Sequence, residues 1–350
     1  MNAESPIAPT VTEIDLDDAG AAEAFDAAAL KHPGATPFHR AAWGRAIRDA
    51  LGHTPHYLMA GDAVLPLIAL KSGLFGSALI SNAFAVRGGP LAGDPRALAA
   101  LDKAAWAIAE AAGIGVLEYR GTEALHPDWA VKAETYANFA RPLEADSEAN
   151  LKAIPRKQRA EVRRSLTMDL SVRVASDAKA LKDHFAVYSE SVRNLGTPVF
   201  PARLFAEIIR HFGADADILT VYHQDEPVAS VLSLYDAETV YPYYGGGTAA
   251  ARALRANDHM YWMLMEHAVA RGRRAFDFGR SKYDTGAFAF KKNWGFEPQP
   301  LVYEYRLAEG RTMPDVNPNN PKYKLMTEVW SRLPLWLANR MGPLVSRSLG

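Results

Sequence analysis

The chain contains no cysteine among its 350 residues. This absence excludes disulfides, thiolate metal ligands and a cysteine nucleophile, so an acyl group cannot be carried as a thioester on the protein. The GxSxG, HExxH and Walker signatures are missing as well. Serine hydrolases, zinc proteases and P-loop enzymes are therefore not indicated. The ten histidines are scattered along the chain, and we predict no metal site.

Long apolar runs and a strong net charge are also missing. The longest uncharged run, residues 72–86, is shorter than the ~20 residues that a membrane-spanning helix needs. The acidic N-terminus lacks the basic and apolar regions of a secretory signal, so we predict a cytoplasmic protein. With a formal net charge of −1, the whole molecule has no global attraction to nucleic acid or anionic lipid, and such binding must be local.

The length of the chain predicts two domains, because single cores usually stop growing near ~250–300 residues. We expect a loose lead-in at residues 1–10 and a first domain at residues 11–145. A second domain with the active cleft is expected at residues 146–308. A linker and an amphipathic tail follow at residues 309–350.

Both halves of the chain follow one plan, in which a β-hairpin leads to a glycine turn, a helix and a short strand with an acidic residue. The turn is Gly88-Gly89 and the acidic residue Glu118 in the first half. Their counterparts in the second half are Gly246-Gly247 and Asp277. The spacings agree within two residues. This agreement predicts two copies of one α/β unit rather than one large sheet.

Residues 240–298 carry the most informative pattern. Residues 240–244 are β-branched and aromatic, which favours a strand, and three glycines at 245–247 end it. Apolar residues then recur at three- and four-residue steps as far as Gly272, and residues 275–278 predict a second strand. Glycines at the end of a strand allow backbone N–H groups to approach a ligand closely, so we expect the active cleft here.

The segments YYGGGT and FDFGRSKYDTGAFAFKKNWGFEP within this stretch resemble the C-terminal half of the FemAB family of amino-acid ligases and its acyltransferase relatives. The resemblance covers about residues 146–308. It implies an α/β fold of two tandem acetyltransferase-like (GNAT) domains, each a mixed twisted sheet flanked by helices. The residues of these two segments are most similar to those of family members associated with exosortase systems for exported exopolysaccharide.

The resemblance also implies a reaction, the transfer of an acyl or aminoacyl group to an amine with no tightly bound cofactor. Family members that build peptidoglycan imply an aminoacyl-tRNA donor. The exosortase-associated members imply a nucleotide- or lipid-linked sugar as acceptor, and an acyl-CoA or acyl-carrier donor stays open. The chain lacks the Q/R-x-x-G-x-G/A loop of acetyl-CoA enzymes, which puts acetyl-CoA itself in doubt. The alternative is a non-catalytic scaffold at the membrane with a degenerate acyltransferase fold.

Two residues of the second half are candidates for catalysis. Lys291 lies in the segment FKKNWG, where the resemblance implies an ammonium that stabilises the oxyanion of the tetrahedral intermediate, with Phe290 packed beside it. The alternative is a helix end with exposed lysines. Asp277 lies in an apolar strand, so it must be paired or act as a base with a shifted pKa. Arg280 is its near partner, and a structural Asp–Arg pair is as consistent with the pattern. Tyr243 and Tyr244 either line the cleft or belong to the core.

A cluster of basic residues near position 160 is the candidate phosphate site. On a helix, Arg156, Arg159 and Arg163 share one face, with Lys157 beside them. The resemblance implies that such residues bind the phosphates of the sugar acceptor, whereas charge runs in general form solvated helix faces.

The last segment, residues 322–350, combines tryptophan and leucine with five basic residues and one acidic residue. This composition is typical of a helix that lies on the inner leaflet of a membrane. Prolines interrupt the segment, so docking on the two domains is the alternative.

Overall fold

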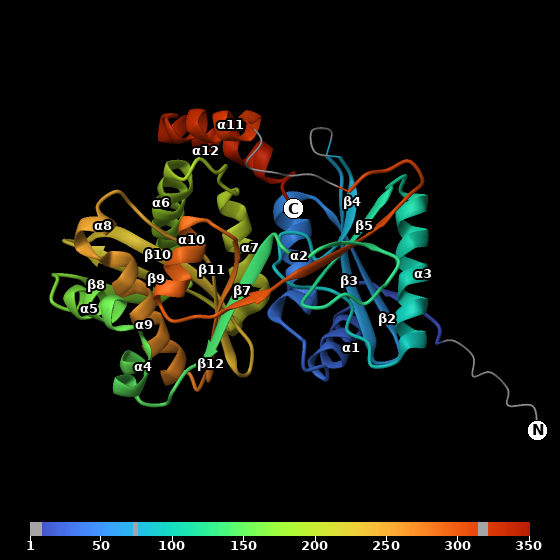
Figure 1. Ribbon diagram of the computed structural model, residues 1–350, viewed down its shortest axis with the longest axis horizontal. Coiled ribbons are helices and arrows are strands. Elements are labelled where there is room, and N and C mark those ends of the chain that lie inside the picture. Colours follow the sequence, from blue (N-terminus) through green and yellow to red (C-terminus); the bar gives the residue numbers. More distant parts are fainter. Residues whose placement is uncertain (1–8, 73–75, 314–320) are drawn as a thin grey trace, which may run out of the picture. The chain divides into compact units, whose positions relative to one another are not determined.

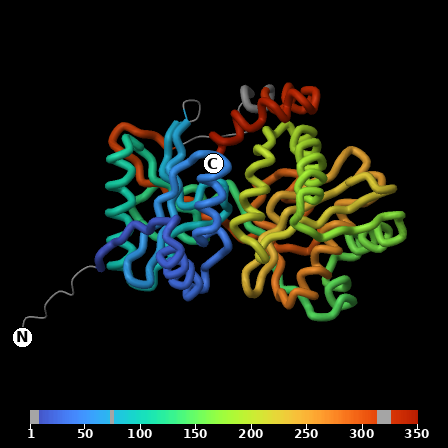
Figure 2. The backbone as a smooth tube through the Cα atoms, turned by 180° about the vertical axis from the view of Figure 1, so that it is seen from behind, coloured from blue at the N-terminus to red at the C-terminus, as the bar shows by residue number. Residues whose placement is uncertain are grey.

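The computed structural model describes residues 9–72, 76–313 and 321–350, without the side chains of 321–325. The chain forms two compact units (Figures 1 and 2). The first comprises Met1–Ala133, Val302–Pro314 and Ser348–Gly350, and the second comprises Glu134–Leu301 and Asp315–Arg347.

The first unit is built on a seven-stranded mixed sheet. Along strand β3, apolar side chains point to both faces, and all eight residues are buried. One face packs against helix α3 and the other against helix α1. In sheet order the strands are β1 (Thr12–Ile14), β2 (Thr54–Ala60), β3 (Ala63–Leu70), β4 (Ala78–Ser81), β5 (Val116–Gly121), β14 (Val302–Leu307) and β6 (Ala130–Lys132), and the helices are α1 (Ala19–Leu30), α2 (Ala41–Leu51) and α3 (Pro95–Ala111).

The second unit repeats this design. Its sheet is covered on one face by α9 and on the other by α6 and α7. In sheet order the strands are β8 (Ser171–Ala175), β9 (Ala216–His223), β10 (Glu226–Tyr235), β11 (Thr239–Gly247), β12 (Ala275–Lys282), β7 (Tyr136–Pro142) and β13 (Pro298–Pro300). The helices are α4 (Ser147–Ala153), α5 (Arg156–Ser165), α6 (Ala178–Asn194), α7 (Ala202–Phe212), α8 (Ala251–Leu254), α9 (Ala256–Ala270), α10 (Gly286–Asn293), α11 (Pro321–Ser331) and α12 (Leu335–Ser346).

Each sheet contains one short parallel contact in its middle. Strands β4 and β5 pair at two positions, with Ile80 opposite Glu118 as the last pair. Strands β11 and β12 also pair at two positions, with Val240 opposite Phe276 as the last pair. Beyond these pairs the strands continue without bonding to each other, so each sheet opens at the same topological place. The predicted two copies of one α/β unit are confirmed in the fold.

The sixth strand of each sheet comes from a distant part of the chain. Strand β7 precedes the second unit's other strands and pairs with β12, whereas β14 comes late and pairs with β5. The boundaries that we expected at 145/146 and 308 therefore differ from the structure. The reason is that pairing with a strand far away in sequence leaves no local mark on composition. After β4, residues 82–84 form a turn in which Asn82 and Phe84 adopt positive φ.

The C-terminal segment forms helices α11 and α12, which pack on α6 within the second unit (Figure 2). Most of the expected linker, residues 314–320, and nearly all of the lead-in lie outside the described residues. Across the described part of the chain, none of the helices combines the length and the apolar character that crossing a bilayer requires.

Candidate functional site

A cleft of about 330 Å³ opens in the second unit at the C-terminal end of β11, where β11 and β12 have separated. Three helices and the glycine end of one strand form it. Its lining residues are Ser191, Asn194 and Leu195 at the end of α6, Gly245, Gly246 and Gly247 on β11, Asn257 and Tyr261 on α9, and Phe290 on α10.

The glycines of β11 are required because two helices approach the strand closely. A Cβ atom on Gly246 would lie 2.3 Å from the Ser191 Oγ atom of α6, and one on Gly247 would lie 2.6 Å from the Asn257 Oδ1 atom of α9. Real Cβ atoms do not approach other atoms so closely, so a side chain at either position would push a helix away. The glycines of β11 thus form the floor of the cleft and allow α6 and α9 to form its two walls.

The Asn257 side chain gives the cleft an unpaired polar group. Its Oδ1 atom is buried and has no hydrogen-bond partner among the described residues. The first turn of α9 is held by α5, through Gln158 Nε2 donating to Asp258 Oδ1 (2.6 Å) and through the Arg255–Glu161 ion pair (2.6 Å). A buried acceptor without a partner costs about 1–3 kcal/mol, and a ligand N–H group would remove that cost.

Lys291 lies on α10, directly after the cleft residue Phe290. Its Nζ atom donates to the carbonyl oxygens of Phe278 (2.8 Å), Gly279 (3.0 Å) and Arg280 (2.9 Å). Burial lowers the pKa of Lys291 to about 7, and the Asp277 carboxylate opposes part of that shift. The alternative interpretation, a helix end with exposed lysines, is correct for Lys292, which is exposed, but not for Lys291, which is partly buried.

Asp277 fixes the same piece of strand β12 from the other side. Its Oδ1 atom accepts from the Gly279 N–H (2.8 Å), and its Oδ2 atom accepts from the Asn138 side chain (3.1 Å). Between Asp277 and Arg280 the register with β7 shifts, and Gly279 has a φ of +67°. Asp277 and Lys291 therefore hold a β-bulge in the part of β12 that has separated from β11.

The remaining candidates of this region have mixed surroundings. The Arg280 guanidinium lies 4.7 Å from the centre of the Tyr136 ring. Phe290 packs on Tyr261 with ring centres 5.7 Å apart. Thus Phe290 lines the cleft, while Arg280 is not among its lining residues.

The two tyrosines of β11 differ from each other. Tyr244 is buried against Phe205 of α7, with ring centres 5.3 Å apart, and burial raises its pKa well above the usual value. Its hydroxyl has no hydrogen-bond partner in the described part of the chain. Tyr243 is half-buried and packs edge-on against Tyr244. A register shift between Leu232 and Ser233 leaves Tyr243 as an extra residue in β11, which explains how consecutive rings meet.

The basic cluster lies on α5, as the spacing predicts. Arg156, Lys157 and Arg163 are exposed, and none of them has an ion-pair partner among the described residues. None of them lines the cleft. They lie on the helix that holds the first turn of α9, whose side chains Asn257 and Tyr261 form one cleft wall.

The corresponding opening in the first unit is filled by its own chain. Arg120, two residues after the last β4–β5 pair, bonds through its side chain to Glu118 (2.7 Å), the Ala85 carbonyl (3.0 Å) and the Gly350 carbonyl (3.0 Å). The backbone N–H groups of Gly88-Gly89 donate to the Arg120 carbonyl. The cavity left there measures about 150 Å³.

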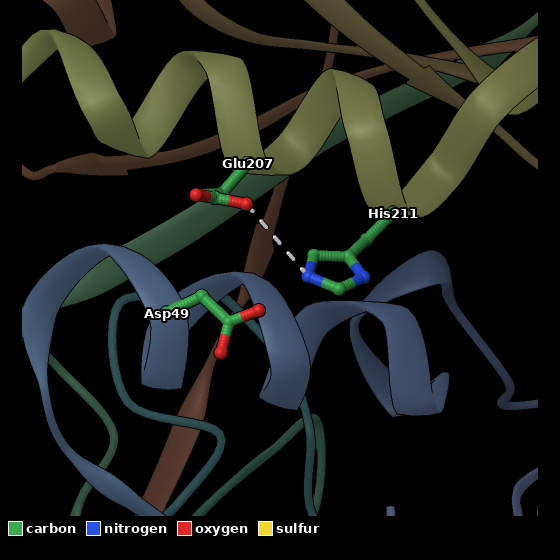
Figure 3. A group of neighbouring side chains, drawn as sticks. All are labelled: Asp49, Glu207 and His211. Atoms are coloured by element: carbon green, nitrogen blue, oxygen red, sulfur yellow. Dashed lines mark ion pairs between the residues drawn. The ribbon is translucent and has the colours of Figure 1, made fainter. Parts of the chain in front are cut away.

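A pair of ionisable side chains on α7 lies apart from these residues. Figure 3 shows Glu207 and His211 projecting from the helix one turn apart, joined by an ion pair of 3.9 Å. Glu207 also accepts from Arg203 (3.2 Å) and Arg210 (2.6 Å). Burial raises the pKa of Glu207, but these two arginines outweigh it and hold the pKa below its usual value. The carboxylate is therefore engaged within its own helix.

Sequence reasoning missed five residues of the cleft, which are Ser191, Asn194, Leu195, Asn257 and Tyr261. Asn257 follows the glycine end of β11 by ten residues and lies in the first turn of α9, beyond the short helix α8, and helix N-termini are places where ligands often bind. That position was the available signal. The residues on α6 give no such signal, because only the packing of α6 on β11 brings them to the site.

Comparison with known proteins agrees with this geometry. Residues 154–292 match the model of the acetyltransferase (GNAT) domain. The chain is similar to the solved structure of FemX, with 16% identity, a TM-score of 0.65, and coverage of 91% of this chain and 100% of that one. Both units have the fold of tandem GNAT proteins.

Two further solved structures show the same likeness. One is a tandem GNAT protein from the clavulanic acid biosynthesis pathway, with 13% identity, a TM-score of 0.55, and coverage of 87% of this chain and 99% of that one. The other is L-PGS from Bacillus licheniformis, with 15% identity, a TM-score of 0.54, and coverage of 89% and 97%. Among curated protein sequences none matches. The expected fold, two tandem GNAT-like domains, is confirmed.

Proposed function

We propose that the protein transfers an acyl or aminoacyl group from an activated donor to an amine of a nucleotide- or lipid-linked sugar, in cell-envelope or exopolysaccharide biosynthesis. The observation that carries the proposal is the cleft at the opening between β11 and β12, inside the segment that matches the GNAT model. Its wall offers the unpaired Asn257 Oδ1 atom, an acceptor suited to the N–H of an amine.

The lack of cysteine excludes a thioester on the protein, and in the proposed reaction the acyl group passes directly between the two substrates, which are bound together. The amine nitrogen attacks the donor carbonyl carbon, a C–N bond forms, and the C–O or C–S bond to the carrier breaks. The attacking nitrogen loses one proton, and the departing carrier oxygen or sulfur takes up one, so that the products are the amide and the free carrier. In this scheme Lys291 supplies positive charge for the oxyanion when protonated. Asp277 acts as a positioning residue, because both of its carboxylate oxygens accept hydrogen bonds that hold the β12 bulge.

The hydrogen bonds in the turn after β11 indicate which class of donor the protein would use. The Ala249 N–H donates to the Glu190 carboxylate (2.8 Å), and the Thr248 N–H donates to the Val228 carbonyl (2.9 Å). These are N–H groups that could otherwise bind a pyrophosphate, and a carboxylate among them repels one. This arrangement supports an aminoacyl-tRNA or an acyl carrier as donor over acyl-CoA.

The exposed basic face of α5 supports a phosphate-bearing acceptor. Arg156, Lys157 and Arg163 are unpaired among the described residues and share a helix that adjoins a cleft wall. A diphosphate on the acceptor would bind these side chains while its sugar amine enters the cleft.

Thermal unfolding in the presence of single candidate substrates tests the proposal. A ligand present at 100 times its Kd stabilises the folded state by about 2.7 kcal/mol, or about 5–10 °C for a unit of roughly 200 residues that unfolds by itself. We expect such a shift with a nucleotide-linked amino sugar and its loss in Arg156→Gln/Arg163→Gln. Arg274→Gln, a change of a highly exposed arginine outside α5, is the matched control and should keep the shift.

Amide formation with the same acceptor and an aminoacyl-tRNA or acyl-carrier donor is the second readout. No product and no shift with any donor or acceptor would contradict the proposal. That outcome would support the second candidate, a non-catalytic scaffold. One observation favours that candidate: the Lys291 and Asp277 side chains are both committed to the backbone of β12.

A further inference from the structure

Helices α11 and α12 expose an unusual face. Trp336 and Leu344 of α12 are 69% and 70% exposed, and Val329 of α11 is 55% exposed. In α12, Trp336, Arg340 and Leu344 recur at four-residue steps, so they lie on one side of the helix. Met326 and Met341 add further exposed apolar surface. Isolated apolar residues on a surface are normal, but a cluster on two adjoining helices marks an interaction site.

The opposite face of these helices is already occupied. Ala338, Gly342 and Ser346 of α12 are buried. A Cβ atom on Gly342 would lie 2.8 Å from the Val199 side chain, and Asn339 donates to the Ser189 hydroxyl of α6 (3.3 Å). The helices are therefore fixed to the second unit by one side, and the exposed side is held outward.

The charges on the exposed side are mostly positive. Arg332, Arg340 and Arg347 are exposed, and among the described side chains from Met326 onward Glu328 is the only acidic one. Aromatic and aliphatic side chains mixed with arginine suit the interface of an anionic bilayer, where the apolar groups enter the headgroup boundary and the cations meet lipid phosphates.

We propose that this face of α11 and α12 docks on the surface of an anionic phospholipid bilayer. It binds peripherally, through Trp336 and Leu344 as apolar anchors and through Arg332 and Arg340 as lipid-phosphate partners. A second copy of the chain would need charge complementarity, which a face with so few acidic side chains does not offer to itself.

The place of attachment links this surface to the cleft. The last turns of α6 serve both: Arg193 donates to the Ser331 carbonyl at the end of α11 (3.4 Å), while the neighbouring Asn194 and Leu195 line the cleft. Docking would hold the cleft near the lipid headgroups. Resting on the proposed function, this favours a sugar acceptor linked to a membrane lipid over a soluble nucleotide sugar.

Co-sedimentation of the full chain with vesicles tests the docking without any activity. We expect pelleting with vesicles that contain about one third phosphatidylglycerol, and none with pure phosphatidylcholine. Arg332→Gln/Arg340→Gln should weaken binding by about 25-fold, from about fivefold for each cation at the surface. Trp336→Ala/Leu344→Ala should weaken it by about tenfold or more. The four side chains changed in these variants are all exposed. The unfolding midpoints of both variants should therefore equal that of the parent.

Matched controls remove similar groups elsewhere. Leu30→Ala/Leu166→Ala deletes two other exposed leucines, and Arg274→Gln deletes another exposed cation; both should pellet like the parent. Equal pelleting of the tail variants and the parent would overturn the proposal. So would absence of pelleting together with lipid-free self-association that the Trp336→Ala/Leu344→Ala change abolishes, since the face would then bind a second copy. Loss of substrate binding with intact pelleting would instead refute only the proposed function.

Discussion

Replacing Lys291 by methionine tests how its amine is held. The change keeps a long side chain but removes the donor to the carbonyls of Phe278, Gly279 and Arg280. Because burial lowers the pKa of Lys291 to about 7, the folded protein binds fewer protons than the unfolded chain between about pH 7 and 10. Stability therefore rises with pH in this window, by up to about 1.4 kcal/mol per pH unit.

Integrated from pH 7 to pH 9, this contribution amounts to about 2 kcal/mol. We expect the free energy of unfolding of the parent to gain that amount over Lys291→Met, measured by urea denaturation at both pH values. Lys292→Met is the control, because Lys292 is exposed on the same helix. Its difference from the parent should not change with pH. Parallel curves for Lys291→Met and the parent would refute the reasoning and show that the carbonyls keep Lys291 protonated throughout.

The same titration predicts the pH dependence of the reaction. If Lys291 acts as an ammonium, as proposed, the transfer rate should fall as pH rises through about 7, in step with the stability change. A rate that increases across this range and levels off, with the increase lost in Lys291→Met, would assign Lys291 the role of a neutral base instead. Initial rates of amide formation at saturating donor, from pH 6 to pH 9, distinguish the two.

Two further changes test the fold around the opening of each sheet. In the first unit, His126 is partly buried, which lowers its pKa, but its hydrogen bond to Asp102 and its ion pair with Glu304 outweigh burial and raise the pKa to about 9. Its contribution is thus complete below about pH 6.5 and disappears through pH 9, so the stability lead over His126→Gln should shrink by roughly 2–3 kcal/mol in urea denaturation; a constant lead would contradict it. In the second unit, Gly246→Ala should cost about 1–3 kcal/mol because its Cβ meets Ser191. Combining it with Ser191→Gly should recover part of that loss, and strictly additive costs would show that the contact is unimportant.

The sequence was sufficient for features that depend on local pattern. The hairpins and helices, the glycine end of β11 and the single basic face of α5 follow from periodicity, turn residues and charge spacing. The exchange of β7 and β14 between the sheets did not, because hydrogen bonds between distant strands have no local signature. The position of the Lys291 side chain was equally hidden. Its three carbonyl partners are defined by a β-bulge, and a bulge depends on the register of strands that the sequence does not fix.

The two units show how one fold can be open in one copy and closed in the other. At the position two residues beyond the last parallel pair, the first unit has Arg120 and the second has Phe278. The Arg120 side chain crosses its opening to reach Glu118, while its carbonyl takes both glycine N–H groups of the turn. In the second unit the opening keeps a cleft of about 330 Å³, and Phe278 packs sideways on Tyr261. A buried arginine with these bonds cannot leave without stranding Glu118, so we expect the first unit to serve as scaffold and the second to bind the substrates of the proposed reaction.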